Sequence, residues 1–349
     1  MGYIDKIIAD ACIRKLNKVL FLIPVVLFAL LFTPVFVLIV ILGNKVDYWD
    51  GYKVATLYPN YILFAAGMLI IAAGFLAYKL LKRIPNNKHT LIGMGIFIGI
   101  SSIVFYFIKI FIAKNIAFLG GWDAGVVANT AIWMYNGMPI GEGFGDYFTI
   151  YEFNVPITWL LHKLYVFASD SASYPYYAEF IWFQYESVLY AIAVFCASMA
   201  VLLMTEDVCP AFLSLFGLSA VLGFSQWNII TYTDGVSIAF PAITFFLYAI
   251  YKKLGSEWKY ILWLPIAAVA RIGSIYKPTT IIVLFAIIVV EVLLLATAEK
   301  HSAKNTIVSI LMIAMGILAC GFIKPIMYSD LNYVPDKSYQ VNWAHVLSY

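Results

Sequence analysis

Residues 120–156 read GGWDAGVVANTAIWMYNGMPIGEGFGDYFTIYEFNVP and form a long polar interval in a chain made almost entirely of apolar runs. The interval contains four of the chain's 19 acidic residues, which are Asp123, Glu142, Asp146 and Glu152. Carboxylates beside a membrane are costly to desolvate, so their clustering often marks a functional site. A solvated outer loop would carry charges as well, and composition alone leaves both interpretations open.

The composition of the whole chain excludes an ordinary soluble domain. Of its 349 residues, 63% are hydrophobic and 12% are charged, and the mean hydropathy is +0.90. Soluble domains carry about a quarter charged residues. We therefore predict an all-α, polytopic membrane protein. The basic residues gather in short loops, so the net charge of +3 indicates no nucleic-acid partner. Four cysteines stand singly and predict buried thiols rather than a disulfide framework or a metal site: Cys12, Cys196, Cys209 and Cys320.

The apolar runs predict about nine transmembrane helices. A shorter run, residues 157–168, is predicted to be an interfacial or re-entrant helix on the outer face. Residues 1–18 are amphipathic and basic and should lie on the cytoplasmic surface. The run that follows is too long for the apolar region of a cleaved signal peptide. The nine spans are expected at about residues 19–43, 61–78, 91–113, 177–204, 210–230, 236–251, 260–275, 281–298 and 307–323.

A basic cluster at residues 79–89 sets the predicted orientation. It contains Lys79, Lys82, Arg83, Lys88 and His89, and short lysine-rich and arginine-rich loops face the cytoplasm. The chain is then a multi-pass protein of the cell membrane with a cytoplasmic N-terminus and an extracytoplasmic polar interval. Counting spans from this cluster brings the polar segments to the same outer side; they carry Asp123, Asp146, Glu152, Asp234, Lys277 and His345.

We interpret residues 1–349 as a single transmembrane domain with four parts. An N-terminal interfacial segment and three spans occupy residues 1–112. An outer loop with the site and its interfacial helices occupies residues 113–176. Six further spans follow at residues 177–323, and residues 324–349 form an outer polar tail.

Asp123 is the strongest candidate for a catalytic group. Glycines on both sides allow the backbone to approach a ligand closely, and Trp122 offers a stacking face. Such a carboxylate can act as a general base, and Glu152 could position it or the substrate. There is no DxD or His-rich spacing, so we expect no cofactor, although a divalent metal at the two carboxylates stays a less favoured alternative. The substrate-lining set is Trp122, Asp146, Tyr147, Tyr151 and His345, although aromatic residues at a membrane interface also serve as packing.

A second group of candidates lies in the later spans. Lys277 stands between two apolar runs in IGSIYKPTTII, residues 272–282, where a cation makes sense if it meets a phosphate. Arg271 could assist from the preceding span, and Asp234 is assigned to the same donor-binding group. Snorkelling to the interface would also explain the two cations, and a helix cap would explain Asp234. Glu179 and Glu186 share a helix face and could line a polar cavity or pair with Arg271.

These motifs resemble those of the GT-C membrane glycosyltransferases, in particular the protein O-mannosyltransferase and aminoarabinose-transferase branch with its bacterial cell-envelope members. The likeness rests on an outer-loop Asp in WDAG (122–125), an acidic residue in YEFNVP (151–156), and the segments YTDGVSIAFP (232–241) and IYKPT (275–279). It covers roughly residues 90–349. Phe153 replaces the usual basic residue, the proline is displaced to Pro156, and two extra spans precede Asp123.

The resemblance implies a glycosyltransferase that uses a polyprenyl-phosphate sugar as donor. A glycan or envelope-polymer hydroxyl would be the acceptor, and membrane lipid would surround the protein. Asp123 would act as general base in an inverting transfer, with Glu152 as its partner and Lys277 and Arg271 near the leaving phosphate. Two other classes stay open. A transporter or flippase for lipid-linked saccharides would use the same charges as a pathway, and a scaffold would need no essential carboxylate.

Overall fold

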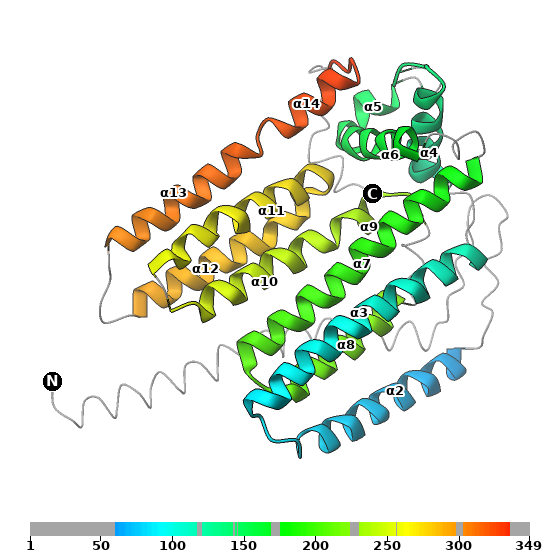
Figure 1. The fold of residues 1–349 in the computed structure, drawn as a ribbon. Coiled ribbons are helices and arrows are strands. Elements are labelled where there is room, and N and C mark those ends of the chain that lie inside the picture. Colours follow the sequence, from blue (N-terminus) through cyan, green and yellow to red (C-terminus); the bar gives the residue numbers. More distant parts are fainter. Residues whose placement is uncertain are drawn as a thin grey trace. The chain divides into compact units, whose positions relative to one another are not determined.

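The computed structural model describes residues 60–116, 121–141, 144, 146–168, 175–223, 230–255, 257–297 and 303–335. Within these ranges the regular structure is helical and contains no strand (Figure 1). Five helices in them are long and apolar enough to cross a membrane. The prediction of an all-α, polytopic membrane protein is confirmed, and the count of nine spans stays a prediction.

The contacts divide the chain into two compact units, residues 1–80 and 81–349. The described part of the first unit is helix α2 (Asn60–Leu81), which contains the span predicted at residues 61–78. The amphipathic segment at residues 1–18 and the first predicted span, residues 19–43, lie outside the described residues.

The second unit contains the long helices. They are α3 (Lys88–Ile116), α7 (Pro175–Thr205), α8 (Val208–Gly223), α10 (Ala239–Lys253), α11 (Trp263–Tyr276), α12 (Ile282–Thr297) and α13 (Ala303–Ala319). Helix α7 packs against α3, α8 and α10, and α11 packs against α10 and α13. Helix α8 is described as far as Gly223, and residues 224–229 of its predicted span lie outside the described residues. Helix α11 has only 14 residues and follows the 3-10 helix η3 (Glu257–Leu262).

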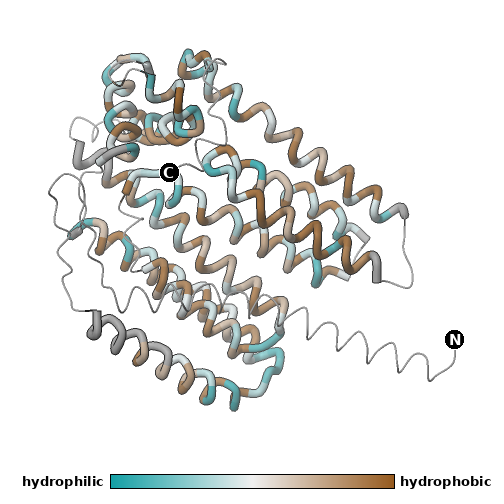
Figure 2. Tube along the Cα trace, turned by 180° about the vertical axis from the view of Figure 1, so that it is seen from behind, coloured by the Kyte–Doolittle hydropathy of each residue, from teal (hydrophilic) through white to brown (hydrophobic). Residues whose placement is uncertain are grey.

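Apolar side chains lie on the outside of this unit as well as in its core. Phe107 on α3 and Ile310 on α13 are each more than half exposed, whereas buried apolar residues such as Trp182 and Val194 fill the interior around α7. Figure 2 shows hydrophobic colouring along much of the long helices. A helix that is apolar on all sides suits a hydrocarbon environment outside and a packed core inside.

Local sequence explains how two of these helices begin. The Asn87 side-chain carbonyl accepts hydrogen bonds from the backbone N–H groups of His89 and Thr90, both at 3.0 Å, and thereby caps α3. Helix α7 ends before Glu206, which has a positive φ of 51°, and Asp207 then accepts the N–H of Cys209 at 2.8 Å to start α8. Both polar turns therefore fix where an apolar run starts.

The polar interval folds into short helices. They are α4 (Trp122–Tyr135), α5 (Tyr147–Ile150), η1 (Glu152–Asn154) and α6 (Val155–Ala168). Helix α6 confirms the short helix predicted at residues 157–168, and it packs against α4. Helix α14 (Ile323–Asp330), at the start of the predicted polar tail, packs against α6 (Figure 1). An apolar cluster containing Ile140, Phe148, Val155 and Leu331 joins these segments.

Candidate functional site

Asp123 lies in the first turn of α4, where its side chain is half-buried. The hydroxyl of Tyr232 donates a hydrogen bond to Asp123 Oδ2 at 3.2 Å. Tyr232 stands immediately before the short helix α9 (Thr233–Ser237), which continues into α10. This hydrogen bond therefore connects the start of the α9–α10 segment to the Asp123 carboxylate in the polar interval.

A second tyrosine belongs to the same cluster. Asn154 in η1 is fully buried, and its Nδ2 donates a hydrogen bond to the Tyr147 hydroxyl at 2.7 Å. Burial and the nearby charge of Asp123 raise the pKa of Tyr147 well above its usual range. Burial, opposed by a hydrogen bond from Asn154 and reinforced by Asp123, raises the pKa of Tyr232 to about 12. Both phenols are therefore neutral at physiological pH and act as hydrogen-bond partners rather than as bases.

An ion pair stands beside this cluster. Lys277 Nζ pairs with Asp234 Oδ1, and about a third of each side chain is exposed. Lys277 is held at the C-terminal end of α11, where its backbone N–H donates to the carbonyl of Gly273 at 2.9 Å. Asp234 follows Tyr232 by two residues, and its charge contributes to the raised pKa of Tyr232. Asp123, Asp234 and Lys277 therefore belong to one polar region.

Arg271 makes its hydrogen bonds within its own helix. Its Nη1 donates to Ser274 Oγ at 3.1 Å, and Ser274 Oγ donates to the Arg271 carbonyl at 2.7 Å. We predicted that Arg271 would assist Lys277. The described residues show no direct contact between the two side chains.

Glu152 contacts α14. Its carboxylate accepts hydrogen bonds from Lys324 Nζ at 2.8 Å and from the Tyr328 hydroxyl at 2.6 Å. Partial burial acts to raise the pKa of Glu152, but these two hydrogen bonds and the charge of Lys324 outweigh it and hold the pKa below its usual value. Glu152 thereby anchors η1, which carries Asn154 to Tyr147 and the Asp123 cluster.

The C-terminal end of helix α14 makes a second set of contacts with α6. Asp330 Oδ2 accepts a hydrogen bond from Trp159 Nε1 at 2.6 Å and pairs with Lys163 Nζ at 2.7 Å. Sequence reasoning missed Lys324, Tyr328 and Asp330 because residues 324–349 were interpreted as an outer polar tail. The signal that could have found them is their amphipathic spacing directly after an apolar span.

The remaining predicted site residues make no hydrogen bond to the Asp123 side chain among the described residues. The backbone carbonyl of Asp146 accepts hydrogen bonds from Thr149 and Ile150, and its side chain is exposed. Tyr151 stacks obliquely on Tyr147, with ring centroids 4.9 Å apart. The side chains of Trp122 and Glu179, together with all of Glu142 and His345, lie outside the described part of the chain.

Two charged residues are buried among the long helices. Lys109 on α3 is fully buried, and its Nζ donates to the carbonyl of Leu222 at 2.8 Å. Glu186 on α7 is also fully buried, and neither carboxylate oxygen has a hydrogen-bond partner among the described residues. Glu186 lies directly against Gly235 at the start of α9. Its contact is therefore with the helix that follows Tyr232.

No group of three or more His, Cys, Asp or Glu side chains in the described ranges could hold a metal ion. Cys196, Cys209 and Cys320 are buried free thiols, as predicted, and Cys12 lies outside these ranges.

Most of the chain matches a known protein family. A family described as conserved hypothetical integral membrane protein matches residues 9–337, which is nearly the whole chain. No curated protein and no solved structure matches this chain.

Proposed function

We propose that this chain, which belongs to the family of conserved hypothetical integral membrane proteins, is a glycosyltransferase. It would move a sugar from a polyprenyl-phosphate donor to a hydroxyl group of a cell-envelope acceptor. The observation that carries the proposal is the half-buried Asp123 carboxylate, held by the Tyr232 hydroxyl at one end of an apolar helix bundle. The Lys277 ammonium beside the same cluster supplies a cation suited to a phosphate.

Asp123 would act as the general base. A carboxylate has about four lone-pair sites, so the hydrogen bond from Tyr232 leaves room for an acceptor hydroxyl. The proton of that hydroxyl passes to Asp123 while its oxygen forms a bond to the anomeric carbon. The bond from this carbon to the phosphate oxygen breaks, its electron pair leaves with the phosphate, and the configuration inverts. Tyr147 and Tyr232 stay neutral, so they orient the carboxylate without competing for the proton.

Lys277 would stabilise the departing lipid phosphate. Its present partner is Asp234, and the pair is partly exposed, so a phosphate oxygen could share or take over the ammonium hydrogen bonds. Stabilising charge that develops on a leaving group lowers the barrier more than binding the ground state does. Asp234 then holds the cation in place between turnovers.

The site is proposed to face the extracytoplasmic side. The basic residues at the start of α3, Lys88 and His89, favour a cytoplasmic start for this helix. Helix α3 is long enough to cross the membrane, so α4 and Asp123 follow on the outer side. This orientation matches a donor that is presented at the outer leaflet.

The buried charges favour one alternative, a transporter or flippase for a lipid-linked saccharide. Ionisable residues inside a bundle often mark a pathway, and Lys109 and Glu186 are both fully buried. A transporter would lose substrate flux on Glu186→Gln and would show no chemical turnover of the donor.

The experiment uses the full chain, purified in detergent, with a panel of radiolabelled polyprenyl-phosphate sugars and a mixture of envelope glycans. The wild type should convert one donor to free polyprenyl phosphate in an acceptor-dependent reaction. Asp123→Asn should lower turnover by roughly 10²–10⁴ because the amide cannot accept the proton. Asp207→Asn is the matched control, since asparagine still caps α8. Full activity of Asp123→Asn would contradict the proposal.

A further inference from the structure

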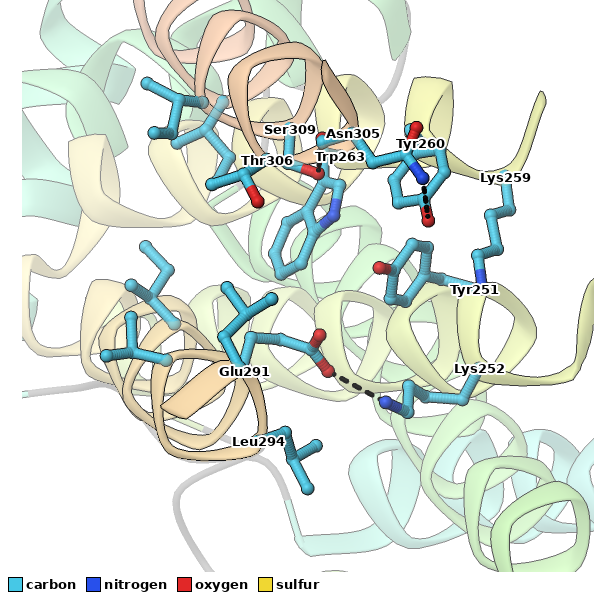
Figure 3. A pocket seen from close by; sticks show the side chains of 15 residues that line it. Tyr251, Lys252, Lys259, Tyr260, Trp263, Glu291, Leu294, Asn305, Thr306 and Ser309 are labelled. Carbon is cyan, nitrogen blue, oxygen red and sulfur yellow. Dashed lines mark hydrogen bonds and ion pairs between the residues drawn. The ribbon is translucent and has the colours of Figure 1, made fainter. Parts of the chain in front are cut away.

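We propose that a cavity bounded by α10, η3, α11, α12 and α13 binds the phosphate headgroup of an anionic membrane lipid. The cavity has a volume of about 430 Å³. Its polar lining includes Lys252, Lys259, Tyr251, Tyr260, Trp263 and Asn305, together with the carboxylate of Glu291 (Figure 3). None of these residues belongs to the Asp123 cluster, and the assignment does not depend on the proposed function.

The cavity lies at the other end of a membrane-spanning segment from the Asp123 cluster. The segment Thr233–Lys253 begins beside Asp234 and ends at Lys252 and Lys253. At 1.5 Å per residue, the two ends of this 21-residue segment are roughly 30 Å apart, which matches the thickness of the hydrocarbon layer. The cavity is therefore placed at the level of lipid headgroups on the opposite side of the membrane from Asp123.

The charges in the cavity leave one cation without a carboxylate partner. Lys252 pairs with Glu291 at 3.0 Å, and Glu291 also accepts a hydrogen bond from the Tyr248 hydroxyl at 2.6 Å. Lys259 Nζ lies 5.5 Å from the ring centroid of Tyr251 and forms no ion pair within the described residues. Two ammonium groups against one carboxylate give the cavity a net charge of +1, which complements a phosphodiester.

Hydrogen-bond donors stand beside this charge. Trp263 is 2% exposed, and its indole N–H has no acceptor in the described part of the chain. Asn305 Nδ2 donates to the Tyr260 hydroxyl at 2.9 Å, which fixes this phenol while its own O–H can still donate. A phosphate oxygen would satisfy the buried indole, and buried donors without partners are rare in folded proteins.

The remaining walls of the cavity favour a lipid over a soluble phosphate ester. Val292 and Leu295 on α12 and Ile310 on α13 line the cavity and are exposed on the outside of the bundle. These aliphatic side chains face the hydrocarbon layer, so acyl chains joined to a headgroup in the cavity would pack against them. A soluble ester has no acyl chains to make these contacts.

The test titrates the full chain in detergent with phosphatidylglycerol, phosphatidylcholine or glycerol 3-phosphate and counts bound molecules by native mass spectrometry. Phosphatidylglycerol should bind most tightly. Lys259→Gln should weaken this binding by about tenfold, because one charge-assisted hydrogen bond is lost. Lys259→Arg should retain it. Glu291→Gln should tighten it, since a negative charge leaves the cavity while the amide oxygen still accepts the Tyr248 hydroxyl.

Lys253→Gln is the matched control, because the adjacent Lys253 pairs with Glu206 and does not line the cavity. An equal loss in Lys253→Gln and Lys259→Gln would overturn the assignment. So would equal binding of phosphatidylcholine and phosphatidylglycerol. Binding of glycerol 3-phosphate as tight as that of phosphatidylglycerol would overturn the lipid assignment and leave a site for a soluble phosphate ester.

Discussion

The Tyr232 hydroxyl donates a hydrogen bond to Asp123 Oδ2 at 3.2 Å, joining two residues that are 109 positions apart. This bond links the start of the α9–α10 segment to the first turn of α4. It holds the proposed base in one orientation at the end of the bundle. Because Tyr232 is neutral, the bond orients the carboxylate without neutralising it.

Removing this donor should slow the proposed reaction. Tyr232→Phe deletes one hydrogen bond to a charged group, and such a bond contributes about 1.5–3 kcal/mol, so kcat should fall by about tenfold or more. The expected drop is smaller than in Asp123→Asn, since the base itself remains. Tyr106→Phe serves as the control, because the Tyr106 ring contacts Phe107 on the same helix. Equal kcat values for the two variants would show that the Tyr232 hydroxyl does not contribute to the proposed reaction.

The Glu152–Lys324 contact predicts a dependence of stability on pH. The pKa of Glu152 is lower in the folded protein than its ordinary value of 4.5. Its ion pair therefore stabilises the fold above that value, and the stabilisation is lost as the pH falls through the folded pKa. The unfolding midpoints of the wild type and Glu152→Gln should differ at about pH 7 and converge as the pH falls through the lowered pKa of Glu152.

Two controls make this measurement specific. Glu206→Gln removes the exposed ion pair with Lys253 and should change the unfolding midpoint less, because solvent screens such pairs. Hydrogen exchange of α14 should rise in Glu152→Gln, since Lys324 and Tyr328 lose their shared acceptor. Unfolding midpoints that stay apart at low pH would show that Glu152 acts through something other than its charge.

The apolar runs predicted the long helices because the length and composition of a run are enough to identify a membrane-spanning helix. The span expected at residues 91–113 lies within α3, and the one at 177–204 lies within α7. Helix α11 begins at Trp263, three residues after the predicted start of its span, and ends at Tyr276, one residue after the predicted end. Apolar residues on either side of a helix end look alike in sequence, so only the caps could have located these ends.

The pairings within the site were harder to predict. Asp123 was singled out by its glycines and by its place in a polar interval, but its partner Tyr232 carries no such signal. Glu152 was expected to act beside Asp123, whereas it contacts α14, 172 residues away at Lys324. Side chains meet across helices according to the packing of the bundle, and a single sequence contains no record of that packing.

Labelling of introduced cysteines should establish the orientation. Met138→Cys and His89→Cys both replace exposed residues, after α4 and at the start of α3 respectively. In intact cells an impermeant thiol reagent should modify Met138→Cys and leave His89→Cys unmodified until the membrane is opened. The background is low because Cys196, Cys209 and Cys320 are buried, and Cys12→Ser removes the fourth thiol. The reverse pattern would place Asp123 on the cytoplasmic side.

The contact between Glu186 and Gly235 predicts a position where a larger residue is unfavourable. A Cβ atom at Gly235 would lie 1.8 Å from Glu186 Oε1 and 2.5 Å from its Cδ, so the buried Glu186 side chain would have to move. Overpacking of this kind costs about 1–3 kcal/mol, and Gly235→Ala should lower the unfolding midpoint. It should also lower turnover, because α9 begins next to Tyr232.

A matched pair of variants separates this clash from the general effect of alanine in a helix. Gly217→Ala on α8 meets no atom within 4 Å, so alanine there should raise the midpoint slightly through its better helix propensity. Glu186→Asp withdraws the carboxylate by one methylene and should restore part of the stability when combined with Gly235→Ala. Restoration by this shorter acid would mean that steric contact, and not the loss of glycine flexibility, destabilises the variant. If the double variant unfolds at the midpoint of Gly235→Ala alone, the close approach of Glu186 to Gly235 does not limit the packing of α7 against α9.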